Sequence, residues 1–513
     1  MEALTGRRAA RLGIVMGALT GAVLAYALLG PFPIGLDDWR WFRVAEPAWE
    51  NALVALAVYA LIGLLAAVAW HRAERFGRGA QAALVASLVA LAFVGQVVAA
   101  MQLPGGYAES IIALGKPGAN RYQAAALRVR ALGPVLADYP GWMREPSQKL
   151  IVTHPAGPLT LYWALNHAFA GREAPARRWM VRFENLLASG TRLRDARGGA
   201  AVAGLFAEMS EAELMGVWLA SFLLRFAAAL AIWPVFALAR AVYGLRTAIW
   251  AGALSAIVPS FVLYSPGLDQ ALPVLAVTAC WLGWTAGFKA SACRAAAAGA
   301  TVSLGLFFSL AFAIVAALAG LMCVAGWLKR EGADGWRGLA VLAGVACAGL
   351  AVPTLTLYVA TGYNSLAVWA ACVEANARFN AQVGRAYWKW VLANPVEFGV
   401  FCGVPAACLF VAATVSALVR VWRERDWKGC DWPTLALAGL LVALNVSGAN
   451  RGEVGRLWMF LMPGCVVAAA AHASSYAPFR RAVLLGAFGL QALQTTVLKS
   501  LLDTMLGIYR GLG

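Results

Sequence analysis

The sequence predicts an all-α polytopic membrane protein, with about 13 transmembrane helices of roughly 20 residues each. Hydrophobic residues fill 61% of its 513 positions, charged residues fill only 13%, and the mean hydropathy is +0.69. A soluble domain carries about 25% charged residues. The apolar residues also gather in long runs. The net charge of +17 therefore indicates Lys- and Arg-rich cytoplasmic loops and contact with membrane lipid, and it does not indicate nucleic-acid binding.

The apolar runs define the predicted spans in chain order. They cover residues 12–31, 51–70, 81–101, 214–238, 248–265, 270–288, 295–309, 311–327, 338–358, 397–419, 432–447, 457–474 and 482–501. The first run follows Arg7, Arg8 and Arg11 without a convincing Ala-x-Ala cleavage site, so we expect an uncleaved first helix. Nine cysteines are scattered without metal-ligand spacing, which indicates small core residues.

The polar segments between these spans set the expected topology of a single integral membrane domain, residues 1–513. A large outer loop covers 102–153, and a second outer loop covers 359–395. Residues 155–170 are apolar but short, and we expect a juxtamembrane helix that only dips into the outer leaflet. The basic ends of the spans then share the inner side with the N-terminus, and the C-terminus lies outside. The basic segment 171–197 lies outside against this rule, as long loops can.

Acidic residues and a histidine border the spans on the expected outer face. Asp37 and Asp38 directly follow the first span, in an aromatic turn. They are either solvated charges in an interfacial aromatic belt, or carboxylates that act as a general base or hold a cation. His154 is either a water-facing residue at a helix start or a donor to a phosphate or sugar hydroxyl. Asp269 is an N-cap, a functional carboxylate, or both.

Residues 450–456 place opposite charges at the start of a later span. Glu453 and Arg456 are three residues apart and share a face of a helix. They form a simple ion pair, or Arg451 and Arg456 form a fork that binds phosphate. The chain has no GxGxxG motif and no P-loop, which disfavours a nucleotide donor in a Rossmann site. Charged residues beside lipid favour a lipid-phosphate substrate.

These segments resemble the GT-C superfamily, which comprises multi-span glycosyltransferases that use polyprenyl-phosphate-linked sugars. Protein O-mannosyltransferases and lipid A aminoarabinose transferases are members. The resemblance rests on the aromatic loop around Tyr107 and 120–122, on 153–158, which is similar to a His-Pro-Pro run, on 259–269, and on 450–463. The chain differs from the family in having no acid at 120–122 and Ala156 in place of the second proline.

The resemblance implies an inverting glycosyltransferase of the GT-C type, which transfers a hexose or pentose to a hydroxyl acceptor. Asp37, Asp38 or Asp269 then removes the hydroxyl proton, and Arg451, Arg456 and His154 stabilise the departing lipid phosphate. The further substrate contacts are Tyr107, Glu109, Tyr122 and Glu453. The reaction is either assisted by a divalent cation (Mg²⁺ or Mn²⁺) or independent of metal. The richness in Ala, Gly and Arg is typical of a GC-rich bacterial genome; in a bacterium we expect the protein in the plasma membrane, with the active face toward the periplasm or cell exterior.

A transporter or flippase for a lipid-linked or polar solute is the alternative function. Such proteins carry repeats and mid-membrane charges. The two halves of this chain show no repeat, and Arg225 is the only strongly placed charge deep in a predicted span. The candidate residues gather at one face, which favours an enzyme. A catalytically silent scaffold with the same fold is a third reading.

Overall fold

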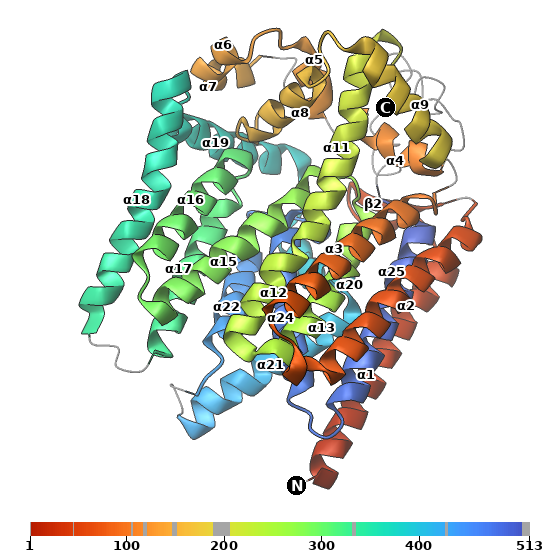
Figure 1. Ribbon diagram of the computed structural model, residues 1–513, viewed down its shortest axis with the longest axis vertical. Coiled ribbons are helices and arrows are strands. Elements are labelled where there is room, and N and C mark those ends of the chain that lie inside the picture. Colours follow the sequence, from red (N-terminus) through yellow and green to blue (C-terminus); the bar gives the residue numbers. More distant parts are fainter. Residues whose placement is uncertain are drawn as a thin grey trace.

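The computed structural model of the chain is a bundle of α-helices (Figure 1). The structure describes residues 2–44, 46–103, 106–115, 121–145, 151–187, 206–330, 335–425 and 429–504. Within these ranges, nine helices are long and apolar enough to cross a membrane, and four shorter apolar helices have 10–17 residues. The predicted all-α polytopic membrane fold is confirmed. Asn120 and the part of the predicted outer segment from 188 to 197 lie outside the described residues.

Three long helices begin the chain and lead to the first large polar segment. They are α1 (Glu2–Leu29), α2 (Trp49–His71) and α3 (Arg78–Ala100). Apolar residues fill each helix all round, as a helix in lipid requires. The end of the bundle opposite the start of α1 is here named the distal end (Figure 1). It carries the short helices α4 (Gly106–Gly115), α5 (Arg121–Arg128), α6 (Leu132–Ala137), α7 (Tyr139–Met143), α8 (Gly157–His167) and α9 (Glu173–Leu187).

The later crossings run between the two ends of the bundle, and several are built from two consecutive helices. The first of them are α11 (Glu211–Leu230) with α12 (Ile232–Tyr243), α13 (Leu245–Ala256) with α14 (Pro259–Leu263), and the turn η4 (Leu268–Ala271) with α15 (Leu272–Lys289). Then follow α16 (Ala292–Phe308), α17 (Phe312–Leu328), α18 (Gly335–Thr361), α20 (Tyr387–Cys402), α21 (Val404–Val419), α22 (Trp432–Ser447), α24 (Met462–Ser474) and α25 (Arg480–Leu501).

Two predicted outer segments prove largely helical. The helix α8 has 11 residues, so it is about 16 Å long and cannot cross a hydrocarbon core of about 30 Å. Its first residue, Gly157, packs so closely on the end of α16 that a Cβ atom would meet the backbone of Phe307. The predicted loop 359–395 contains α19 (Ser365–Val383) and the first half of α20. The predicted span 397–419 is divided at Gly403, which has a φ of 103°: α20 begins earlier, at Tyr387, and the candidate membrane span begins at Val404.

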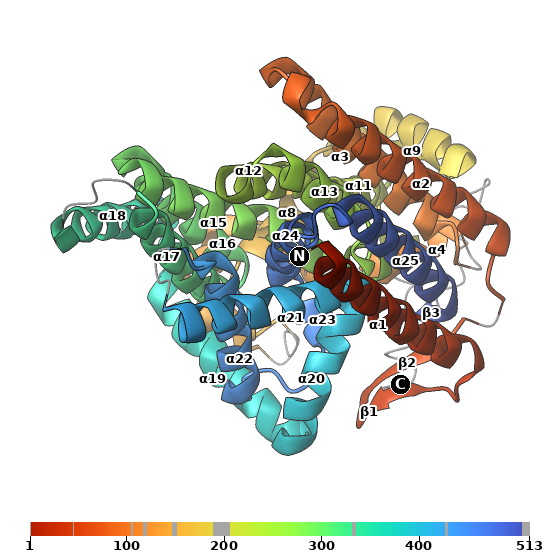
Figure 2. The same ribbon diagram turned by 90° about the horizontal axis from the view of Figure 1, so that it is seen from below.

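Small residues let neighbouring helices approach closely inside the bundle. Gly283 and Gly287 of α15 face the backbone of α17 at Ala319 and Cys323, where a larger side chain would collide with a carbonyl oxygen. Such small residues four apart are typical of helix pairs in membranes, where packing replaces the hydrophobic effect as the driving force. Viewed from the opposite end of the bundle, α1 lies beside α25 and α21 (Figure 2). The first and last helices thus pack together.

One small antiparallel sheet ties the two ends of the chain together near the distal end. Its order is β1 (Ile34–Leu36), β2 (Trp39–Arg43) and β3 (Leu502–Asp503). Phe42 pairs with Asp503, so the segment after α1 hydrogen-bonds to the segment after α25. The turn predicted at 37–43 is therefore the tip and second strand of a hairpin with a fixed position.

Candidate functional site

The β1–β2 hairpin holds Asp37 and Asp38 at its tip. Asp37 has φ 52°, in the left-handed region that L-residues avoid, and its carbonyl accepts a hydrogen bond from Arg40 Nε at 2.7 Å. Alternate residues of β2 point inward: Trp39 and Trp41 are 2% and 8% exposed. Trp41 packs on Phe401 with ring centroids 5.3 Å apart. Two buried indoles thus anchor the strand and present the acid pair at the edge of the bundle.

A second tight segment, residues 448–458, approaches the hairpin from the other half of the chain. Gly452 and Glu453 both have left-handed backbone, with φ 91° and 63°. The Gly452 N–H donates to Asn394 Oδ1 at 3.1 Å, and the Gly455 N–H donates to Glu397 Oε1 at 2.9 Å. Glycine fits the first position without strain, but the second holds a glutamate at a cost of roughly 1–2 kcal/mol. Strain of this kind gathers at functional sites.

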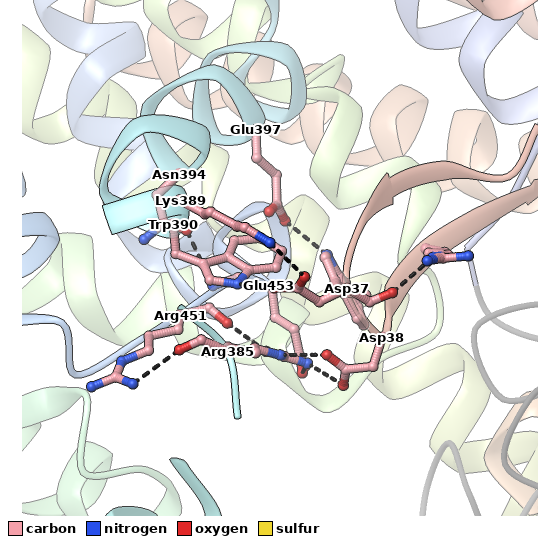
Figure 3. A network of polar contacts seen from close by, with 12 residues as sticks. Asp37, Asp38, Arg385, Lys389, Trp390, Asn394, Glu397, Arg451 and Glu453 are labelled. Carbon is pink, nitrogen blue, oxygen red and sulfur yellow. Dashed lines mark hydrogen bonds and ion pairs between the residues drawn. The ribbon is translucent and has the colours of Figure 1, made fainter. Parts of the chain in front are cut away.

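Arg385, between α19 and α20, joins the two segments (Figure 3). Its Nε and Nη2 atoms donate to the two carboxylate oxygens of Asp38 at 2.7 and 2.8 Å, although the residues are 347 positions apart. The same Nη2 lies 3.2 Å from Glu453 Oε1. Partial burial acts to raise the pKa of Asp38, but the hydrogen bonds and charge of Arg385 hold that pKa below its ordinary value of 3.8. Asp38 is therefore a weak base that stays ionised.

Asp37 lies in a different environment from its neighbour. Trp390 Nε1 donates to Asp37 Oδ2 at 3.1 Å, and Lys389 Nζ lies 3.5 Å from Asp37 Oδ1 (Figure 3). Its side chain is 30% exposed. Asp37 thus has one hydrogen bond from a neutral donor and one long ion pair, and it lacks the two-pronged arginine contact of Asp38. Of the two carboxylates, it is the better placed to accept a proton.

Arg456 extends the charged network toward η4. Its Nη2 lies 2.8 Å from Glu453 Oε2, and its Nε lies 3.6 Å from Asp269 Oδ2. Glu453 therefore touches an arginine with each oxygen, and the chain of contacts runs from Asp38 through Arg385, Glu453 and Arg456 to Asp269. The structure brings together the predicted residues of three separate loops. Arg451 joins through its backbone, because its carbonyl accepts a hydrogen bond from Arg385 Nη1 at 2.5 Å.

His154 and Tyr122 lie within electrostatic range of Arg456. Burial, and then the charge of Arg456, lower the pKa of His154 to about 4, so the imidazole is neutral at physiological pH. Thr153 Oγ1 lies 2.8 Å from His154 Nδ1; with the hydroxyl as donor, the ring proton stays on Nε2. The Tyr122 ring contacts the imidazole edge-on at 5.6 Å. Burial raises the pKa of Tyr122 well above its usual range. Both residues are neutral hydrogen-bond donors.

Tyr107 and Glu109 are placed differently from the other predicted substrate contacts. Tyr107 is completely buried and stacks on Trp218 at 5.6 Å, and its hydroxyl accepts a hydrogen bond from Arg225 Nη1 at 3.0 Å. Its ring belongs to the core under α4. Glu109 lies on the first turn of α4, within electrostatic range of Lys499. Arg225, the charge deep in a predicted span, has hydrogen-bond partners inside the bundle, Tyr107 and Ser110.

The segment 385–397 was not predicted to belong to the site, although it supplies Arg385, Lys389, Trp390, Asn394 and Glu397. These residues fell in a predicted loop and at the start of a predicted span, and none was singled out. A usable signal is the run Arg-Ala-Tyr-Trp-Lys-Trp at 385–390, which combines cations with aromatic residues just before an apolar stretch. The acid hairpin shows the same combination with the opposite charge. The opposite charges of these two aromatic segments, 385–390 and 37–41, could have been used to predict that they lie in contact.

Arginine side chains already contact the carboxylate oxygens of Asp38 and Glu453, which a divalent cation between these two residues would need. Mg²⁺ and Mn²⁺ need several free oxygen ligands. Both oxygens of Asp38 accept from Arg385, and the two oxygens of Glu453 lie against Arg385 and Arg456. In the described part of the chain, no three His, Cys, Asp or Glu side chains are grouped so that they could hold a metal ion. Arginine occupies the positions that a bridging cation would need.

No family model and no curated protein matches this sequence. The crystal structure of the Archaeoglobus fulgidus oligosaccharyltransferase, in complex with Zn and sulfate, is similar over 58% of this chain, with 18% sequence identity and a TM-score of 0.33. The match spans 43% of the oligosaccharyltransferase chain, less than half of its length. A TM-score this low establishes neither a shared family nor a shared activity.

Proposed function

We propose that this protein is an inverting membrane glycosyltransferase of the GT-C type. It transfers a hexose or pentose from a polyprenyl-phosphate donor to a hydroxyl acceptor at the distal end, which faces the periplasm or cell exterior. The observation that carries the proposal is the joining of the strained acid hairpin to the strained segment 452–456 through Arg385. This arrangement puts acids and arginines at the edge of an apolar bundle, where a lipid-linked phosphate has its headgroup.

Asp37 is the proposed general base. As the acceptor oxygen attacks the anomeric carbon, its proton passes to an Asp37 oxygen, and the bond between that carbon and the phosphate oxygen breaks. A base must be free to receive the proton, and a lowered pKa weakens it. Asp38 does not meet either requirement, because Arg385 donates to both of its oxygens and lowers its pKa. The proposed role of Asp38 is therefore to hold the Arg385 side chain in place. Asp269 lies next to Arg456, which suits it to orienting that arginine.

Arg451 and Arg456 are the proposed contacts of the departing polyprenyl phosphate. Arg456 is 28% exposed and is oriented by Glu453 and Asp269. Arg451 donates from Nη1 to the Arg385 carbonyl at 3.0 Å, and its buried Nε atom has no partner within the described residues. Fixed cations that meet the developing charge usually supply the largest part of catalysis. Neutral His154 and Tyr122 then contribute hydrogen bonds to the sugar or phosphate.

Transfer by purified protein tests the proposal. The protein is incubated in detergent or nanodiscs with a panel of radiolabelled polyprenyl-phosphate sugars and short glycan acceptors. We expect transfer by the native chain and a loss of about 10²–10⁴-fold in Asp37→Asn. Asp138→Asn is the matched control: Asp138 caps α7 by accepting from the Gly141 N–H, and asparagine caps equally well. Equal activity of Asp37→Asn and the native chain contradicts the proposed base.

Failure to bind or turn over any lipid-linked sugar contradicts the glycosyltransferase function itself. The transporter alternative then becomes testable by counterflow of labelled solute in proteoliposomes. Counterflow without transfer would replace the proposed function with transport.

A further inference from the structure

Arg385 has a geometry that ordinary surface ion pairs lack. Its side chain is only 7% exposed, whereas exposed pairs such as Arg378 with Glu374 leave both side chains more than 60% exposed. Its guanidinium makes a two-pronged contact with Asp38 and a third contact with Glu453. Planar two-pronged pairing is the strongest form of the arginine–carboxylate contact. One buried cation therefore bridges two acids from opposite halves of the chain.

The surroundings hold this guanidinium in place. It lies over the Trp390 ring at 5.5 Å from the ring centroid. Its Nη1 donates to the Arg451 carbonyl, and Arg451 Nη1 donates back to the Arg385 carbonyl. A Cβ atom at Gly452 would lie 3.2 Å from Arg385 Nη1, so the backbone there closes on the side chain. Burial acts to lower the pKa of Arg385, but Asp38 and Glu453 raise it overall, so the positive charge is permanent.

The position of this charge is the one that a bridging metal ion needs. A divalent cation shared by Asp38 and Glu453 would require the oxygens that now accept from Arg385. Arginine supplies one positive charge from a planar group with fixed donors, and it needs no free ligand positions. A divalent cation placed beside the guanidinium would also be repelled by its positive charge, which lowers the affinity of the same two carboxylates for metal.

We propose that Arg385 is a built-in cation that replaces a bridging metal ion between Asp38 and Glu453, so that this site works without a divalent metal. It is a positioning residue: it orients Glu453, which in turn orients Arg456. The role of Arg385 in catalysis rests on the proposed glycosyltransferase function. Its role in excluding a metal ion is independent of that function, because it depends only on which cation Asp38 and Glu453 bind.

Manganese binding tests the metal statement without any need for activity. Purified full-length protein is titrated with Mn²⁺, and bound metal is read by electron paramagnetic resonance. We expect the native chain to show no site tighter than about 1 mM, and Arg385→Ala to gain one site by freeing the oxygens of Asp38 and Glu453. The double variant Arg385→Ala/Asp38→Asn is the control and should lose the gained site.

Two results would overturn the proposal. One is a native-chain Mn²⁺ site that Asp38→Asn abolishes. The other is that Arg385→Ala gains no Mn²⁺ site although it is folded, as judged by size-exclusion chromatography and its thermal unfolding transition. If Arg385→Ala does not fold, the titration of the native chain and of Asp38→Asn still decides the question.

The transfer rate of the purified protein provides a second, independent test. We expect the native chain to keep its full transfer rate in EDTA, and Arg385→Ala to lose about 10²–10³-fold. Added Mn²⁺ or guanidinium should raise the transfer rate of Arg385→Ala at least about tenfold. A purely structural role for Arg385 predicts no such rescue. Loss of native transfer in EDTA would contradict the proposal. If the protein transfers none of the sugars, the proposed function is contradicted. The Mn²⁺ titration then remains the test of whether Arg385 takes the place of a metal ion.

Discussion

Glu453 joins two arginines through one carboxylate from a backbone position that L-residues avoid. Replacing it with alanine or with glycine separates the two effects, because both changes remove the carboxylate and only glycine relieves the left-handed backbone. The carboxylate lies 3.2 Å from Arg385 and 2.8 Å from Arg456, and its side chain is 14% exposed. Each hydrogen bond between charged groups contributes roughly 1.5–3 kcal/mol.

That contribution is reduced here because both arginines keep another partner. Arg385 retains Asp38, and Arg456, which is 28% exposed, retains Asp269. We therefore expect Glu453→Ala to lower the free energy of unfolding by about 2 kcal/mol. Left-handed backbone costs an L-residue roughly 1–2 kcal/mol. The greater freedom of glycine in the unfolded chain takes back roughly 0.5–1 kcal/mol. Glu453→Gly should thus be more stable than Glu453→Ala by about 0.5–1 kcal/mol.

The assay is unfolding by SDS in mixed micelles, followed by tryptophan fluorescence. The control is Glu424→Ala, which removes an exposed partner 3.8 Å from Arg420 and should change the free energy of unfolding by less than about 0.5 kcal/mol. If Glu453→Ala is at least as stable as Glu453→Gly, the backbone at 453 is not left-handed. If both variants match the control, the carboxylate does not bridge the two arginines.

Three further predictions concern the acid hairpin and His154. The Asp37→Asn variant should lose about 10²–10⁴-fold in transfer rate, whereas Glu74→Gln, which changes an exposed acid paired with Arg246, should not. The folded-state pKa of Asp38 lies below its ordinary value, so its ion pair stabilises the fold above about pH 4 and is lost as the pH falls through that folded-state pKa. The midpoint of thermal unfolding should fall more steeply on acidification in the native chain than in Asp38→Asn, and equal slopes would contradict this. Because the pKa of His154 is about 4, the pH profile of transfer should show no step near 6.5; a step that His154→Asn removes would contradict this.

Much of the architecture follows from the sequence because lipid imposes a simple rule. Backbone groups in hydrocarbon must bond within their own segment, so each long apolar run becomes a helix. The spans at 51–70 and 81–101 correspond to α2 and α3, and the short run at 155–170 contains the 11-residue helix α8. The boundary at 397 was wrong because Gly403, with a φ of 103°, ends α20, and the candidate membrane span begins only at Val404.

The candidate site was only partly readable from the sequence. Charges beside spans are costly and therefore informative, which is how Asp37, Asp38, Asp269 and Glu453 were selected. Tyr107 was selected because its aromatic loop resembles that of the GT-C family, but it is buried against Trp218. An aromatic residue in a loop looks the same in sequence whether its ring faces a substrate or fills the core. Burial depends on which other segments cover it, and one-dimensional patterns do not contain that information.

Composition and periodicity alone determined that this chain is a helical membrane protein with charged, aromatic segments at the borders of its spans. Only the tertiary structure decided which of those segments meet. Arg385 pairs with Asp38 across 347 positions, and Phe42 pairs with Asp503. The reason is physical: hydrophobic burial in lipid depends on local sequence and is nearly independent of partners. An ion pair depends on the distance between two particular atoms, and that distance is set by how all the helices pack together.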